Sequence, residues 1–175
     1  MMNGQRRVES NARLTAQLGM LLLILLAVEG FTILGIQRML PLHIFVGFLV
    51  VPPLLLKMGS TTYRFVRYYT RDADFRAAGP PAWAHRLLGP VLIFLTMVLM
   101  VTGIGLWLIG YDPLWVLAHK ASFVAWFGLM TIHVLGHLNR AQSLAWVDWR
   151  HPLTAGRLTP RNVMVASFIL GLALG

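Results

Sequence analysis

The stretch LWVLAHKASFVAWFGLMTIHVLGHL, residues 114–138, is long and apolar, and it carries histidines at 119, 133 and 137. A helix that crosses a bilayer needs about 20 mostly apolar residues. Ionisable side chains are rare in such helices, and they usually have a function. The stretch therefore predicts a transmembrane helix and also points to the residues on which a function can rest.

The rest of the chain has the same apolar character. It has 175 residues, of which 57% are hydrophobic and 12% are charged, with a mean hydropathy of +0.68. A soluble domain of this size exposes too much surface to hide so much apolar area. Three further runs, 14–35, 41–60 and 84–110, are each long enough to span a bilayer. We therefore predict an all-α integral membrane protein with a four-helix bundle core.

The apolar run at 163–175 is shorter than the others and has no polar residue after it. It predicts the start of a fifth transmembrane helix, a partial one, in a chain that we expect to be truncated there. The predicted organisation is a cytoplasmic N-terminus over 1–13, a transmembrane domain over 14–140, a cytoplasmic connection over 141–162, and this last segment.

The basic residues predict the orientation of the helices. All but two of the 15 Lys and Arg residues fall on the side of the N-terminus, and the exceptions are Arg38 and Lys120. The positive-inside rule places that side in the cytoplasm. The net charge of +9 is thus a topology signal, and no nucleic-acid partner is expected. The connection 61–83 is predicted to extend the second helix until Gly-Pro-Pro at 79–81 breaks it.

Histidine is the residue type to which a function can be assigned, because the chain has no cysteine for disulfides or thiolate metal sites. His43 and His119 lie near the outer ends of their predicted helices. His85 and His133 lie toward the cytoplasmic side, with His137 one turn beyond His133. On one helix, 14 residues separate His119 from His133 by about 21 Å, with a rotation of roughly 40°.

These depths predict two pairs, His43 with His119 and His133 with His85. Two imidazoles that face each other from different helices form an axial ligand set for haem iron. Gly47 and Gly89 each follow a histidine by four residues, so they share its helix face and leave room for a porphyrin. Arg86 at the cytoplasmic rim suits a haem propionate.

Simpler interpretations exist for each of these residues. A histidine in a membrane helix can serve only to hydrogen-bond a neighbouring helix, and glycines are common where helices pack closely. Arg86 can act only as a topology determinant. We favour the haem hypothesis because four histidines pair by depth.

With these residues the chain resembles the bacterial cytochrome b561-type membrane cytochromes b, a superfamily that includes the cytochrome b subunits of formate dehydrogenases and Ni–Fe hydrogenases. The resemblance covers about residues 14–140, and its most specific element is the 14-residue spacing of His119 and His133 on the fourth helix. The chain departs from the family at the first helix, which lacks the expected inner histidine. His85 is then the best substitute as the inner ligand, with His137 as the alternative.

The resemblance implies haem b, two per chain or one at minimum, and electron transfer across the membrane between quinone or quinol and a partner redox protein. It implies a bacterial inner membrane and an oxidoreductase subunit without a catalytic site of its own. Two alternatives stay open. One is a transporter or sensor that binds metal ions through His133 and His137, which lie four residues apart. The other is a membrane anchor subunit without haem.

Overall fold

The computed structural model describes residues 2–79, 83–149 and 159–175, without the side chains of 2–3, 83–86, 137, 139–141 and 143–149. The described residues form helices joined by short loops, with no strand among them, as predicted for an all-α protein. The helices are α1 (Met2–Leu34), α2 (Ile36–Tyr69), α3 (Ala73–Ala77), α4 (Trp83–Ile109), α5 (Pro113–Trp149) and α6 (Pro160–Leu174).

Four of the helices are long and apolar enough to cross a membrane: Gly4–Leu34, Ile36–Tyr69, Leu87–Ile109 and Pro113–Gly136. Large apolar side chains are exposed along them, for example Leu34, which is 84% exposed. Such surfaces are suited to membrane lipid. The protein is therefore a multi-pass membrane protein, as the composition predicted.

Several helices run further than the predicted spans. α1 begins at Met2, so residues 2–13, predicted as a polar N-terminal segment, are helical. α2 begins at Ile36 and contains Pro41, which was expected at its start. α5 continues to Trp149, beyond the predicted limit of the bundle at 140. Hydropathy marks where a helix enters the apolar layer, whereas the helix itself continues into polar surroundings.

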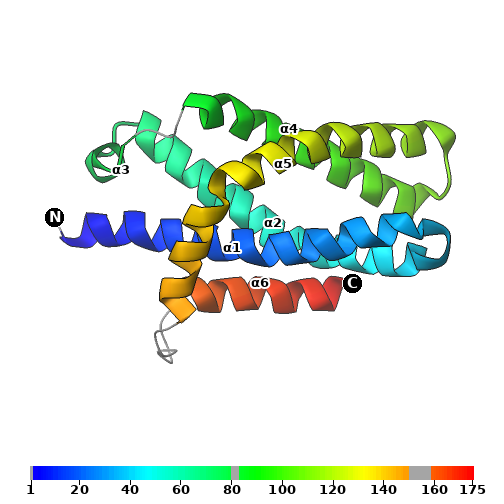
Figure 1. The fold of residues 1–175 in the computed structure, drawn as a ribbon, viewed down its shortest axis with the longest axis horizontal. Coiled ribbons are helices and arrows are strands. Elements are labelled where there is room, and N and C mark those ends of the chain that lie inside the picture. Colours follow the sequence, from blue (N-terminus) through cyan, green and yellow to red (C-terminus); the bar gives the residue numbers. More distant parts are fainter. Residues whose placement is uncertain (1, 80–82, 150–158) are drawn as a thin grey trace. The chain divides into compact units, whose positions relative to one another are not determined.

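The helices form two compact units. Unit 1 contains residues 1–80 and 139–175, and unit 2 contains residues 81–138. In unit 1, α1 and α2 form an antiparallel pair with a single residue, Gly35, between them, and α6 packs against both (Figure 1). The core of unit 1 is aliphatic, and its buried residues include Leu18, Leu22, Val46, Leu49 and Met164.

α6 packs on α2 at the place where proline interrupts its hydrogen bonding. Pro53 lies inside α2 and has no N–H, so the carbonyl of Leu49, four residues earlier, loses its helical donor. Gly171 of α6 lies against this carbonyl so closely that a Cβ at position 171 would collide with the Leu49 oxygen. The Cα–H that occupies this direction is a weak donor to the oxygen. The run predicted as a partial fifth span thus covers an exposed backbone group.

A polar seam joins α1 and α2 near the N-terminal end of unit 1. The hydroxyl oxygens of Thr15 and Ser60 lie 2.8 Å apart, and Asn11 donates to the Ser60 carbonyl at 3.2 Å. Lys57, one of the basic residues on the side of the N-terminus, donates from Nζ to the Thr15 carbonyl at 2.9 Å. Gly19 leaves the space for this ammonium group, since an added Cβ would lie 3.0 Å from Nζ.

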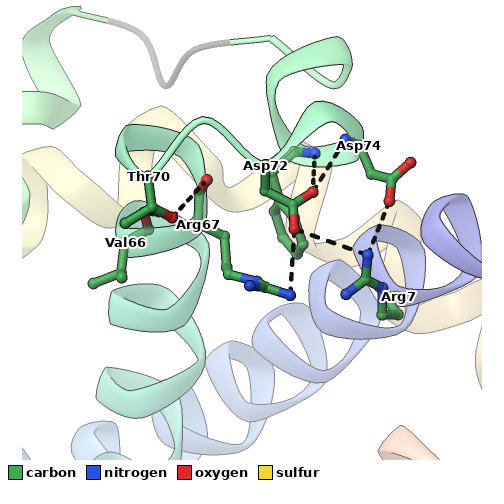
Figure 2. Close-up of polar contacts among 7 residues, drawn as sticks. Arg7, Val66, Arg67, Thr70, Asp72 and Asp74 are labelled. Carbon is green, nitrogen blue, oxygen red and sulfur yellow. Dashed lines mark hydrogen bonds and ion pairs between the residues drawn. The ribbon is translucent and has the colours of Figure 1, made fainter.

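The prediction that Gly-Pro-Pro at 79–81 ends the second helix is wrong. α2 ends at Tyr69, because Arg71 adopts a left-handed backbone with φ of 64°. Asp72 then caps the short helix α3, and its side chain accepts from the N–H groups of Asp74 and Phe75. Figure 2 shows that Asp72 also faces the guanidinium groups of Arg7 and Arg67, at 3.8 and 3.3 Å.

Unit 2 is a helical hairpin made of α4 and the first part of α5. α4 ends at Ile109, and the next residue, Gly110, has a φ of 87° that suits glycine. Asp112 then caps α5, because its Oδ1 accepts from the N–H groups of Leu114 and Trp115 at 2.9 Å each. Further along the hairpin, the buried Trp126 donates from Nε1 to Thr96 Oγ1 at 2.9 Å. This bond fixes α5 against α4.

Candidate functional site

His43 lies near the start of α2 and faces α1. Its Nδ1 lies 2.8 Å from Thr32 Oγ1 and 3.1 Å from Glu29 Oε1, both on α1. Thr32 is fully buried, and the side chains of His43 and Glu29 are about four-fifths buried at 20% and 18% exposure. The sharp turn at Gly35 places these three residues at the same level of the α1–α2 pair.

The hydrogen bonds of Thr32 determine the tautomer of His43. Thr32 Oγ1 donates its only proton to the carbonyl of Glu29 at 2.5 Å, so it can only accept from the imidazole. A Glu29 carboxylate at Nδ1 is likewise an acceptor. His43 therefore carries its proton on Nδ1, and the lone pair resides on Nε2. Metal-binding histidines have this arrangement, with one ring nitrogen donating to a carboxylate or oxygen and the other holding the metal.

His119 on α5 has a matching arrangement in unit 2. Its Nδ1 lies 3.0 Å from Thr102 Oγ1 of α4. The Thr102 hydroxyl donates within its own helix, where it reaches the carbonyls of Val98 at 2.8 Å and Leu99 at 3.0 Å. When its proton stays within the helix, the hydroxyl accepts from His119 Nδ1–H, and the lone pair of this ring is then on Nε2.

Gly103, next to Thr102, makes room for the His119 ring. An added Cβ at this glycine would lie 3.1 Å from His119 Cε1. A larger residue at position 103 would require the ring to shift by a few tenths of an ångström.

Both histidines are suited to bind haem iron through Nε2. They are imidazoles in apolar helical units, each with Nδ1 bound to a threonine oxygen. The two lie in different units, His43 in unit 1 and His119 in unit 2, and each is described within its own unit. Their pairing across one haem stays a prediction.

The structure describes some of the other predicted site residues in full and others by their backbone alone. His133 is half-buried on α5, which is one continuous helix from His119 onward, so the spacing argument for this pair applies. His85 and Arg86 lie in the first turn of α4 and His137 lies in α5. The side chains of these last three lie outside the described residues, so the predicted inner site remains a prediction.

The two predicted haem-clearing glycines differ in their surroundings. An added Cβ at Gly47 would lie 3.5 Å from Glu29 Oε1, an ordinary contact, so this glycine of α2 borders the contact between Glu29 of α1 and His43 of α2. At Gly89 an added Cβ would meet no described atom within 4 Å, so the helix surface there is open. The open surface at Gly89 is compatible with a flat ligand against α4.

The sequence analysis missed the partners of the two histidines. Thr32 and Thr102 are ordinary helix residues by composition, and the sequence analysis did not single out Glu29. A signal was present in unit 2, where Thr102 lies about as far before the turn between α4 and α5 as His119 lies after it. In unit 1 the distances differ, because Thr32 lies closer to Gly35 than His43 does. Residues at equal distances from a tight turn meet across an antiparallel helix pair.

Within the described residues no group of three or more His, Cys, Asp or Glu side chains is placed to hold a metal ion. No family model, curated protein or solved structure matches the chain.

Proposed function

We propose that this protein is a b-type membrane cytochrome of the b561 kind, which carries electrons across a bacterial inner membrane. The electrons would pass between quinone or quinol and a partner redox protein, and the N-terminus would lie in the cytoplasm. The observation that supports the proposal is the matched pair Thr32–His43 and Thr102–His119, in which a threonine hydroxyl lies within hydrogen-bond distance of Nδ1 of each ring, so that Nε2 would be the nitrogen that binds iron.

His43 and His119 would hold the outer haem. The bound haem supplies reversible one-electron exchange between ferric and ferrous iron. Thr32 and Thr102 fix the tautomer and the orientation of the two rings. Glu29 Oε1, 3.1 Å from His43 Nδ1, would add a second hydrogen-bond partner for that ring. Apolar helices around the rings exclude water from them.

His133 would bind a second haem nearer the cytoplasmic side. The spacing on α5 supports this site, because regular helix geometry within one continuous helix would place His119 and His133 on nearly one face at different depths. His85 is the proposed opposite ligand, with His137 as the alternative, and Arg86 would pair with a propionate.

Two other functions compete with this one. A metal-ion transporter or sensor would use His133 and His137, whose spacing places two imidazoles on one helix face. It would leave the threonine-fixed tautomers of His43 and His119 without a purpose. A haem-free anchor subunit would need only the apolar surfaces.

The decisive experiment is a dithionite-reduced minus oxidised visible spectrum of the purified protein, combined with a pyridine haemochrome assay of haem per chain. Two b-type haems support both sites, and one haem that is lost in His43→Leu and His119→Leu supports the outer site alone. Absence of haem in protein made with ample haem supply would overturn the proposal. Metal analysis of the haem-free protein would then distinguish a metal transporter from an anchor.

A further inference from the structure

A hollow of about 400 Å³ opens in unit 1 where the N-terminal ends of α1 and α6 meet the C-terminal half of α2. Residues from all three helices line it: Arg6, Arg7, Ser10, Asn11, Leu14, Tyr63, Pro160 and Val163. All of these residues belong to the same unit. The hollow is separate from the histidine site, which lies toward the Gly35 end of the α1–α2 pair.

The charges around the hollow leave it basic. Asp74 accepts from Arg7 at 2.9 Å, and Asp72 lies between Arg7 and Arg67, as Figure 2 shows. Both carboxylates are therefore already neutralised by arginines. Arg6 has no carboxylate partner among the residues that the structure describes. Arg7 keeps further N–H donors, since a guanidinium has five and Asp74 is bound through one nitrogen.

The lining changes from polar to apolar across the hollow. Arg6, Ser10 and Asn11 provide donors on one side, whereas Leu14 and Val163 provide apolar contact on the other. Tyr63 begins the aromatic and basic end of α2, and tyrosine is typical of the headgroup level of a membrane. A lipid has the same sequence of chemistry, because its charged headgroup adjoins its apolar acyl chains. The first turn of α6 adds the positive end of a helix dipole.

We propose that this hollow binds the phosphate of an anionic phospholipid. Arg6 would form the charge-assisted hydrogen bonds to the phosphate, with Ser10 as a further donor, and the acyl chain would lie along Leu14 and Val163. Arg7 is held in place by Asp74 and contributes its remaining donors. The lipid would then join α6 to the α1–α2 pair at the membrane surface.

The test is native mass spectrometry of the full chain in detergent, titrated with phosphatidylglycerol and, separately, with phosphatidylcholine. We expect one phosphatidylglycerol to bind in preference to phosphatidylcholine. Arg6→Gln should weaken this binding about tenfold, as expected for the loss of about 1.4 kcal/mol. Arg38→Gln is the matched control, because it removes an exposed arginine from the other end of unit 1. It should change the affinity less than twofold.

Three results would overturn the proposal: equal binding of the two lipids, equal losses in the two arginine variants, or displacement of the lipid by millimolar inorganic phosphate. The last result would identify a soluble phosphate as the ligand. Ser10→Ala provides a second variant with a smaller expected loss. Circular dichroism checks that the variants remain folded. The assay needs no haem, so its outcome is independent of the proposed electron transfer.

Discussion

Thr102 Oγ1 lies 3.0 Å from Nδ1 of His119, and its own proton is directed to backbone carbonyls of α4. This relationship decides which nitrogen of the ring carries the proton. It recurs in unit 1, where Thr32 binds His43 in the same way. Two helical hairpins with little sequence in common thus share one way of presenting an imidazole, and this similarity is the strongest structural argument for a ligand at Nε2.

Thr102→Val is expected to weaken the binding of the proposed haem at His119. Valine keeps the shape of threonine but removes the acceptor for Nδ1–H, and loss of such a partner typically weakens metal binding by roughly 10–100-fold. The rate at which haem transfers from the protein to excess apomyoglobin would measure how much more weakly the variant holds it. ¹⁵N NMR of the imidazole in haem-free protein should show the Nδ1–H tautomer losing its preference. Thr131→Val is the control, since this exposed hydroxyl binds only its own helix at Phe127 O. Identical spectra and retention in both variants would contradict the assigned role.

Gly171→Ala is expected to destabilise unit 1. The added methyl group would collide with the Leu49 carbonyl oxygen, which belongs to the backbone of α2 and cannot rotate away. Overpacking of this kind costs about 1–3 kcal/mol. Unfolding in mixed micelles with increasing SDS would measure the free energy. Gly59→Ala is the matched control, because an added Cβ at this α2 position meets no described atom within 4 Å. Equal stability of the two variants would show that α6 does not pack on α2 in this way.

Thr15→Val tests the polar seam between α1 and α2. The variant loses the 2.8 Å contact between the Thr15 and Ser60 hydroxyls but keeps the carbonyl that accepts from Lys57. Hydrogen bonds between membrane helices average about 0.6 kcal/mol and reach about 1.7. The same unfolding assay should show a loss in this range. A stability equal to that of the unaltered protein would mean that water or lipid replaces the hydroxyl contact.

Thr96→Val is expected to destabilise unit 2. Trp126 would keep its buried Nε1–H without an acceptor, and an unsatisfied buried donor costs about 1–3 kcal/mol. Hydrogen–deuterium exchange of the α4–α5 hairpin should accelerate. Trp126→Phe combined with Thr96→Val removes both partners and should recover part of the loss. If the double variant is destabilised by the sum of the two single-variant losses, the hydrogen bond between Trp126 and Thr96 does not explain those losses.

The sequence predicted the transmembrane helices well, because the bilayer requires long apolar segments whatever the tertiary packing. It predicted the end of α2 poorly, since the left-handed residue Arg71 and the cap at Asp72 act before the prolines at 80 and 81. The partners Thr32 and Thr102 depend on the register between two helices, and hydropathy contains no information about register. The histidines could be found because their residue type is rare in membranes.

Pro53 and Gly171 have a consequence for the way the protein is made. The ribosome delivers α2 long before α6, since more than 100 residues separate the two positions. During that interval the Leu49 carbonyl lacks the cover that Gly171 later provides, and an unsatisfied backbone group in the bilayer costs several kcal/mol. The α1–α2 hairpin is therefore an unfinished intermediate, and we expect it to remain near the insertion machinery until α6 emerges. Biogenesis of unit 1 would then depend on timing as well as on hydrophobicity.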